Sequence, residues 1–256
     1  KGFKEKSRAI ISRIAGAVEA DLEIEEIAKS LKAQKSTTKL RDLLSPSTRR
    51  AAFVGFLLAG LVQLDGMNAV VNYAPKIFQG AGFEIQNALL NTSFIGVINF
   101  VFTFVAIVVI DKVGRKTLYL VGSLGMCVAL FCLATTYFLH VEGVLTMVFV
   151  LAFVAFFAAC IGPVFWTLVS EIFPNRIRGK AVALASSIQW SVYFLVALLF
   201  PRFLELVGGG FAFLFFAVMT LLQFLVVRHY LPETRGKSLE EIEMHWHEAS
   251  TTGREN

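Results

Sequence analysis

A short apolar stretch of the sequence carries four polar side chains, Gln63, Asp65, Asn68 and Asn72. On one continuous helix, Asp65, Asn68 and Asn72 would share a face, whereas Gln63 would join them only if Gly66 loosened the helix. Amide side chains both donate and accept hydrogen bonds, so this cluster suits a neutral, polyhydroxylated ligand such as a sugar better than an ion. Amides that bond between helices and merely hold a bundle together explain the pattern equally well.

Further polar or irregular features interrupt other apolar stretches. Asn99 and Gln189 are isolated amides, and each by itself suits a structural role. Gly162 and Pro163 interrupt a helical pattern, and a helix broken in this way exposes backbone groups that transporters use to bind substrate. Trp166, beside this break, can stack on the apolar face of a sugar ring or simply pack against its neighbours.

These side chains stand in a sequence that is too apolar for an ordinary soluble domain. The 256 residues are 56% hydrophobic and only 17% charged. The apolar runs approach the ~20 residues that a spanning helix needs, and they predict six spans. These cover residues 51–73, 86–110, 117–139, 143–168, 181–201 and 210–230. Since lipid cannot satisfy unpaired backbone groups and the periodicity is helical, we expect a helical bundle and not a barrel.

The basic residues predict which side of the membrane each loop occupies. All of the 24 Lys and Arg residues except Lys76 and Arg202 fall in the first 50 residues, in the loops 111–116 and 171–180, or beyond residue 227. Basic loops stay on the cytoplasmic side during insertion, so we expect a multi-pass protein of the cell membrane with both ends in the cytoplasm. The net charge of +5 then reflects topology and an anionic lipid surface, and requires no nucleic-acid partner.

The same pattern divides the chain into three parts. Residues 1–50 place apolar side chains at helical spacing among charges, which predicts short cytosolic amphipathic helices. Residues 51–230 are expected to form the six-helix bundle, and residues 231–256 a cytosolic tail. The first residues lack the apolar core of a signal peptide, and a start at Lys1 indicates either processing or a piece of a longer protein.

Four motifs resemble the sugar porter family of the major facilitator superfamily. Gln63-Leu64 followed by Gly66-Met67-Asn68 and Tyr73 is similar to the signature of the family's seventh helix. Residues 111–116 resemble the loop between helices eight and nine, and residues 232–242 the motif beyond helix twelve. Gly162-Pro163 with Trp166, then Ser170 to Pro174 and Arg178-Gly179, resembles helix ten and the loop after it. Four matches at the right separations across residues 50–243 make chance implausible, although a single one would be weak.

The resemblance implies an all-α membrane fold, the six-helix C-terminal half of the major facilitator fold, built from two inverted three-helix repeats and preceded by short cytosolic helices. It implies a monosaccharide substrate, facilitative or proton-coupled transport by alternating access, and an N-terminal six-helix half as partner. No cofactor is implied. The candidate substrate-binding residues are Gln63, Asn68, Asn72, Asn99, Phe157, Trp166 and Gln189, and the candidate gating or helix-break residues are Tyr73, Gly162 and Pro163.

The sequence also departs from the family's pattern at four positions. Val62 stands where the first Gln of a pair is common, and Asn72 replaces the first of two tyrosines. Asp65 occupies a position that is usually small or neutral, and Ala158 stands where many members carry Glu. Losing one Gln removes a hydrogen-bond partner for the ligand, so the sugar preference should differ from that of better known hexose carriers.

Four charged residues at the predicted cytoplasmic helix ends are candidates for a charge network that forms and breaks in each transport cycle: Arg115, Glu171, Arg178 and Glu233. In the family such residues pair when the carrier faces outward. Charges that only anchor helices at the membrane interface are the alternative. Proton coupling in the family uses an acid in the other half, and Asp65 is either a substitute for it or a hydrogen-bonded structural acid.

Other classes of protein fit the sequence in different degrees. A carrier of a related polyol such as inositol is a close variant, and a sugar-sensing or regulatory half-transporter is a second class. The tail after Glu233 is too short to favour a sensor. The spans offer no paired carboxylates, no His cluster at metal-ligand spacing and no nucleophile with a base, so neither an enzyme nor a metal site is expected.

Overall fold

The computed structural model describes residues 5–7, 11–12, 16, 24, 43, 45, 48–141, 143–173 and 177–233. By its contacts the chain divides into two units, Lys1–Leu43 and Leu44–Asn256. Most of the predicted amphipathic segment 1–50 and of the predicted tail 231–256 lies outside the described residues. The fold described below is therefore that of the second unit.

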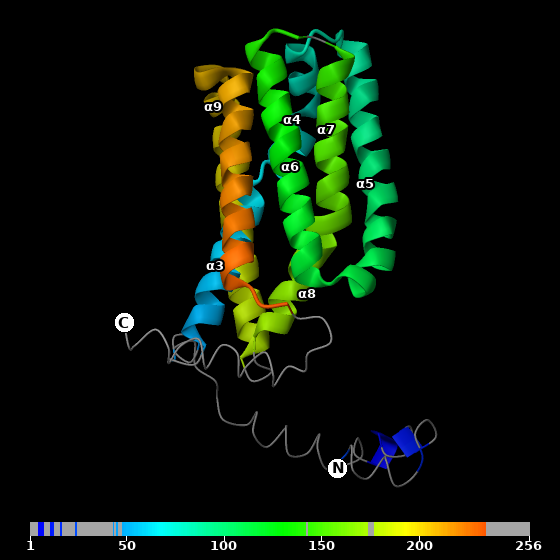
Figure 1. Cartoon of the computed structure of the whole chain (residues 1–256), viewed down its shortest axis with the longest axis vertical. Helices are drawn as coiled ribbons and strands as arrows, with labels where there is room; N and C mark the ends of the chain where they lie inside the picture. The colour runs from blue at the N-terminus through cyan, green and yellow to red at the C-terminus, as the bar shows by residue number, and fades with distance from the viewer. Residues whose placement is uncertain are drawn as a thin grey trace. The chain divides into compact units, whose positions relative to one another are not determined.

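Helices account for nearly all of the described second unit (Figure 1). Their bounds are α3 Arg49–Leu64, α4 Met67–Gly80, α5 Ile85–Val113, α6 Arg115–Phe138, α7 Val144–Phe156, a π-helical turn η2 Phe157–Ile161, α8 Gly162–Ile172 and α9 Arg178–Tyr230.

Five continuous stretches in the described part of the chain are long and apolar enough to cross a membrane: Arg49–Gly80, Ile85–Val113, Arg115–Phe138, Val144–Ile172 and Arg178–Tyr230. The last has 53 residues, about 80 Å of helix, which is more than twice the ~30 Å thickness of a hydrocarbon core. It is interrupted at Gly208, whose φ of 79° and ψ of 164° are not helical and favour glycine. The interruption divides α9 into residues 178–207 and 209–230, which makes six crossings, as the sequence predicts.

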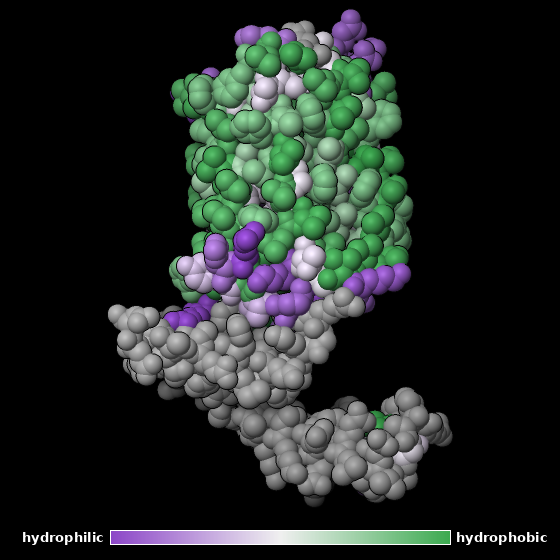
Figure 2. All heavy atoms as spheres, viewed as in Figure 1, coloured by the Kyte–Doolittle hydropathy of each residue, from purple (hydrophilic) through white to green (hydrophobic). Residues whose placement is uncertain are grey.

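The chain direction places the helix ends at two opposite ends of the bundle. One end, called here the charged end, contains the start of α3, the α5–α6 junction, the end of α8 and both termini of α9. The opposite end contains the α4–α5 and α6–α7 connections and the Gly208 interruption. Between them, the surface is a band of apolar side chains, and hydrophilic side chains gather at the ends of this band (Figure 2). The helix α5 is the most exposed span in the described part of the chain, with only 11% of its most apolar stretch buried, so the other helices cover it least.

Small residues bring the helices of the bundle close together. α9 packs against α3 and α6, and α6 packs against α7 and η2. A Cβ added at Gly122 of α6 would stand 2.5 Å from the Cβ of Cys160, and one added at Gly125 would meet the ring of Phe156. Glycine at these two positions lets α6 approach its neighbours more closely than any other residue would allow.

Candidate functional site

A break at Gly66 separates α3 from α4 in the middle of the first span. Gly66 has a left-handed φ of 93°, and a Cβ there would stand 2.6 Å from the ring of Phe216 on α9. Both the backbone conformation and the close ring therefore require glycine. The break frees the polar side chains around it from the geometry of a continuous helix.

Two hydrogen bonds bridge this break. The Met67 backbone N–H donates to Asp65 Oδ1 at 2.9 Å, and the Asn68 side-chain amide donates to the Gln63 side-chain oxygen. The prediction that Asp65 shares one helical face with Asn68 is wrong, because Asp65 caps the end of α3 and the helix does not continue. The loosening at Gly66 instead brings Gln63 to Asn68, the arrangement that the sequence left open.

The amides of α4 continue along its contact with α9. The Asn72 amide donates to the Tyr193 hydroxyl at 3.1 Å, and the Tyr73 hydroxyl donates to the Ala197 carbonyl at 2.8 Å. The two helices run in the same direction here, because residues later on α4 meet residues later on α9. Asn68 precedes Asn72 by four residues on α4, and Gln189 precedes Tyr193 by four residues on α9. The Asn68 and Gln189 side chains therefore lie at similar heights along the two parallel helices.

Gln189 is buried and is only 8% exposed. Its side-chain oxygen has no hydrogen-bond partner among the described residues. A buried amide oxygen without a donor is costly, and a hydroxyl-rich ligand would supply the missing donor. Tyr193 was not singled out from the sequence, although its i+4 spacing from Gln189 places the two side chains on the same helix face.

The helix α4 has a second irregularity at Tyr73. Its backbone, with φ −116° and ψ 15°, is not helical, and Pro75 follows two residues later. Proline removes a backbone donor and bends a helix. The ring of Tyr73 packs on Phe200 with centroids 5.4 Å apart. The predicted helix-break residue Tyr73 therefore lies at a kink, and its side chain is held by α9.

In the fourth span the helix continues from Val144 to Ile172, but it changes type just before the predicted break at Gly162 and Pro163. The π-helical turn Phe157–Ile161 ends where α8 begins at Gly162, with Pro163 in the first turn, where its missing N–H costs little. A Cβ at Gly162 would stand 3.2 Å from the Phe157 ring. Trp166 is 42% exposed and meets Phe165 edge to face.

The candidate residues thus form two groups. Gln63, Asn68, Asn72 and Tyr73 line the contact of the broken first span with α9, where Gln189 also lies. Phe157, Gly162, Pro163 and Trp166 belong to η2 and α8, and half-buried Asn99 lies on α5, which packs against η2. In residues 48–141, 143–173 and 177–233, no hydrogen bond or ring contact joins Asn99 or Trp166 to the first group.

At the charged end, three of the four predicted network residues meet at the α5–α6 junction. Arg115 pairs with Asp111 at 3.0 Å and with Glu171 of α8 at 3.2 Å. Gly114 has a φ of 98°, and a Cβ there would stand 3.0 Å from the carboxylate of Glu233. Arg178 at the start of α9 donates through two nitrogens to the carbonyl of Phe173 at the end of α8, each at 3.3 Å.

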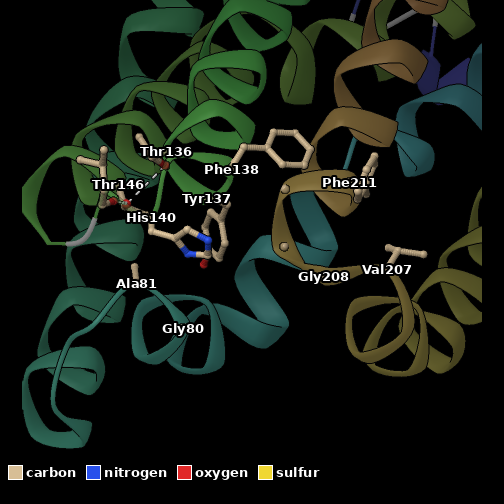
Figure 3. A pocket seen from close by; sticks show the side chains of 13 residues that line it. Gly80, Ala81, Thr136, Tyr137, Phe138, His140, Thr146, Val207, Gly208 and Phe211 are labelled. Carbon is tan, nitrogen blue, oxygen red and sulfur yellow. Dashed lines mark hydrogen bonds between the residues drawn. The ribbon is translucent and has the colours of Figure 1, made fainter.

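A polar cavity of about 390 Å³ opens at the opposite end, between the ends of α4 and α6 and the Gly208 interruption. Thr136, Tyr137, His140 and Thr146 line it together with Gly208, and Thr146 bonds Thr136 at 3.4 Å (Figure 3). A second cavity of about 430 Å³ lies between Leu64 and α9 and has only apolar side chains. None of the sequence-based candidates lines either cavity. Among the described residues, no three His, Cys, Asp or Glu side chains are grouped to hold a metal ion.

Comparison with known proteins gives consistent matches along the chain. Residues 1–246 match the family described as Sugar (and other) transporter. The chain is 37% identical over 246 residues to the arabinose-proton symporter of Bacillus subtilis, covering 96% of this chain and 53% of that protein. It is 37% identical over 252 residues to the D-xylose-proton symporter of Escherichia coli, covering 96% and 51%.

The fold matches as well. A crystal structure of a double tryptophan mutant of XylE superimposes with a TM-score of 0.82 at 37% identity, covering 94% of this chain and 52% of that one. The chain spans about half the length of the curated relatives it matches, and its six crossings correspond to half of such a transporter fold. Sequence and fold agree, and the chain belongs to the sugar (and other) transporter family.

Proposed function

We propose that the chain is the C-terminal half of a secondary transporter of monosaccharides that works by alternating access. The observation that carries this proposal is the pair of amides, Gln63 and Asn68, bonded across the Gly66 break inside a membrane span. Polar side chains inside a membrane span are costly, and transporters place them at discontinuous helices to bind substrate. The unpartnered oxygen of buried Gln189 adds an acceptor close to them.

The proposed substrate is a monosaccharide or a closely related polyol. Four relatives of the chain are named as an arabinose-proton symporter, a D-xylose-proton symporter, a glucose facilitated diffusion protein and a major myo-inositol transporter. Amides bind hydroxyl groups of any of these ligands. Transport by facilitated diffusion and transport with protons are both represented among these names, so the proposal covers both.

The proposed sugar contacts are Gln63, Asn68, Asn72, Asn99, Phe157, Trp166 and Gln189, with Tyr73, Gly162 and Pro163 at the irregular helix positions that adjust during gating. They would form one wall of a site near the middle of the membrane, and an N-terminal six-helix half would supply the other wall. Support for this pairing is the coverage of about half of each relative.

The proposed orientation has the charged end, and with it both ends of the chain, in the cytoplasm. Support comes from the basic residues, which are concentrated in the loops of this end. Residues 1–50 and 231–256 would then be cytosolic on either side of the membrane bundle. Arg115, Glu171, Arg178 and Glu233 would form a cytoplasmic charge network that pairs while the carrier faces outward, and the ion pair of Arg115 with Glu171 supports this proposal.

Uptake of radiolabelled sugars tests the function. Cells that make the chain together with an N-terminal half should accumulate or equilibrate arabinose, xylose, glucose or inositol faster than cells with either half alone. Gln63→Ala should reduce this uptake, and Gln79→Ala, which removes an exposed amide near the end of α4, should not. Uptake that stays at the background for all four ligands, with both halves present in the membrane, would contradict the proposal.

A further inference from the structure

Asp65 is a buried acid that the proposed sugar contacts do not use. Its exposed fraction is 0%, and it lies inside the first membrane span, at the last position before the Gly66 break. Oδ1 accepts the Met67 N–H at 2.9 Å, whereas Oδ2 has no hydrogen-bond partner among the described residues. A carboxylate in these surroundings would be a buried charge with half of its acceptors unsatisfied.

In the part of the chain that the structure describes, the helices packed around Asp65 provide no compensating cation. The Tyr119 hydroxyl of α6 interacts electrostatically with Asp65. This hydroxyl also accepts a 2.9 Å hydrogen bond from the Gln223 amide of α9. On the α9 side, the ring of Phe216 covers Gly66. In residues 48–141, 143–173 and 177–233, no Lys, Arg or His side chain forms an ion pair with Asp65.

Two buried acceptors in this region have no hydrogen-bond donor among the described residues. Asp65 Oδ2 and the Gln223 side-chain oxygen both lack a partner in the described part of the chain. A proton on Oδ2 removes the charge of Asp65 and turns an unsatisfied acceptor into a donor. Both consequences relieve the cost of burial, so the surroundings favour the protonated carboxyl group.

We propose that Asp65 is a proton-binding site of this protein, loaded in the conformation described here and emptied when the Gly66 break opens to water. The only bond that changes is the O–H bond at Oδ2, which forms with a proton taken from water and breaks by returning that proton to water. No other reactant is required.

The position of Asp65 links this proton to the amides of the proposed sugar site. The bond from Met67 to Asp65 and the bond from Asn68 to Gln63 cross the same break. A charged Asp65 would have to reach water or a new donor, and that movement would displace the ends of α3 and α4 that hold Gln63 and Asn68. Coupling of the proton to sugar rests on the proposed function, whereas the proton site itself does not.

Infrared spectroscopy of the purified protein in lipid tests the proton site directly, because a protonated carboxyl group has a carbonyl stretch well separated from that of a carboxylate. At neutral pH the protein should show this band, shifted in heavy water. Asp65→Asn should remove it, and Asp65→Glu should restore it at a shifted frequency. Asp111→Asn removes a carboxylate whose side chain is 76% exposed and should leave the band unchanged.

Absence of the band in the unchanged protein at neutral pH, or its persistence in Asp65→Asn, would overturn the proposal. Sugar uptake at several pH values provides the second measurement. Asp65→Asn should abolish the dependence of uptake on the proton gradient while uptake down a sugar gradient continues. Full proton dependence in Asp65→Asn would overturn the coupling, whereas absence of uptake in the unchanged carrier would count against the proposed function and leave the infrared result standing.

Discussion

The ring of Tyr137 lies directly against Gly209, at a distance that leaves no space for a Cβ on that residue. From this position the Tyr137 hydroxyl donates a 2.7 Å hydrogen bond to the Ile77 carbonyl of α4, and the ring packs on Phe213 of α9. The Tyr137 side chain of α6 therefore contacts both the end of α4 and the start of the second part of α9, residues 209–230. This contact borders the polar cavity of Figure 3.

Gly209→Ala should destabilise the protein by about 1–3 kcal/mol, the usual effect of overpacking a filled site, because the new methyl group must displace the Tyr137 ring. Thermal or denaturant unfolding in detergent measures the change. Gly96→Ala is the matched control, since nothing lies within 4 Å of a Cβ at Gly96 on α5. There the substitution should leave the stability unchanged or raise it. Equal effects of the two substitutions would contradict the prediction.

Tyr137→Phe should cost about 1 kcal/mol of unfolding free energy, because it removes the hydrogen bond to Ile77 and leaves the ring packing in place. Tyr230→Phe, at a residue that is 58% exposed, should change stability by less than about 0.5 kcal/mol. The same unfolding measurement compares both variants, and an unchanged stability of Tyr137→Phe would show that the hydroxyl does not hold α4.

Gln63→Ala should weaken sugar binding in the assembled carrier by about 10- to 100-fold, since it removes one amide and leaves Asn68 without its partner, at a cost of ~1–3 kcal/mol. Equilibrium binding of labelled sugar measures the affinity. Gln63→Glu preserves the acceptor oxygen for Asn68 and should retain more affinity than the alanine variant. Wild-type affinity in Gln63→Ala would remove this residue from the site.

Arg115→Gln should slow turnover by about tenfold, equivalent to ~1.4 kcal/mol, and should change sugar affinity by less than about twofold. The reason is that Arg115 pairs with Asp111 and Glu171 at the charged end, far from the Gly66 break. Lys112→Gln removes an exposed positive charge from the same junction and is the matched control. Transport rates and binding constants measured together test this prediction, which fails if affinity is lost and turnover is unchanged.

Gly114→Ala should destabilise the protein by at least ~1 kcal/mol, because φ at this position is 98° and ψ is 152°, a region open almost only to glycine. The added Cβ would also stand 3.0 Å from the Glu233 carboxylate. A double-mutant cycle with Glu233→Ala separates the two causes. In the Glu233→Ala background, Gly114→Ala should lower the unfolding free energy by less than in the wild type, but not by zero. No destabilisation in that background would show that backbone strain contributes nothing.

Prediction from sequence succeeded where the cause is local. Each span begins within three residues of the expected position, because hydropathy depends on each residue's own contact with lipid, whereas the ends differ by up to seven residues, as at Gly80. The Gly162-Pro163 pair marked the irregular region of the fourth span, because such a pair disfavours a regular helix, but the structure has a π-helical turn there and not an open break. The motif matches also proved specific, as the family assignment shows.

Prediction failed or stayed open where the cause is a neighbour far away in the chain. The left-handed backbone at Gly66 requires glycine, and the ring of Phe216, 150 positions later, is a second requirement that the sequence does not reveal. The prediction that Asp65 and Asn68 share a face assumed a continuous helix, and the break at Gly66 removes that assumption. The roles of the candidate sugar and charge-network residues remain predictions until they are measured.

The sequence by itself determined that this chain is a membrane bundle of six crossings, with its basic loops at one end and amides in its first span, because composition and charge act on each segment separately. Only the tertiary structure decided that Gln63 meets Asn68 across Gly66, that Asn72 meets Tyr193, and that Asp65 is buried with one oxygen unpartnered. These contacts depend on the register between helices, and that register is set by side-chain packing over more than 100 residues of sequence separation, as between Tyr119 and Gln223.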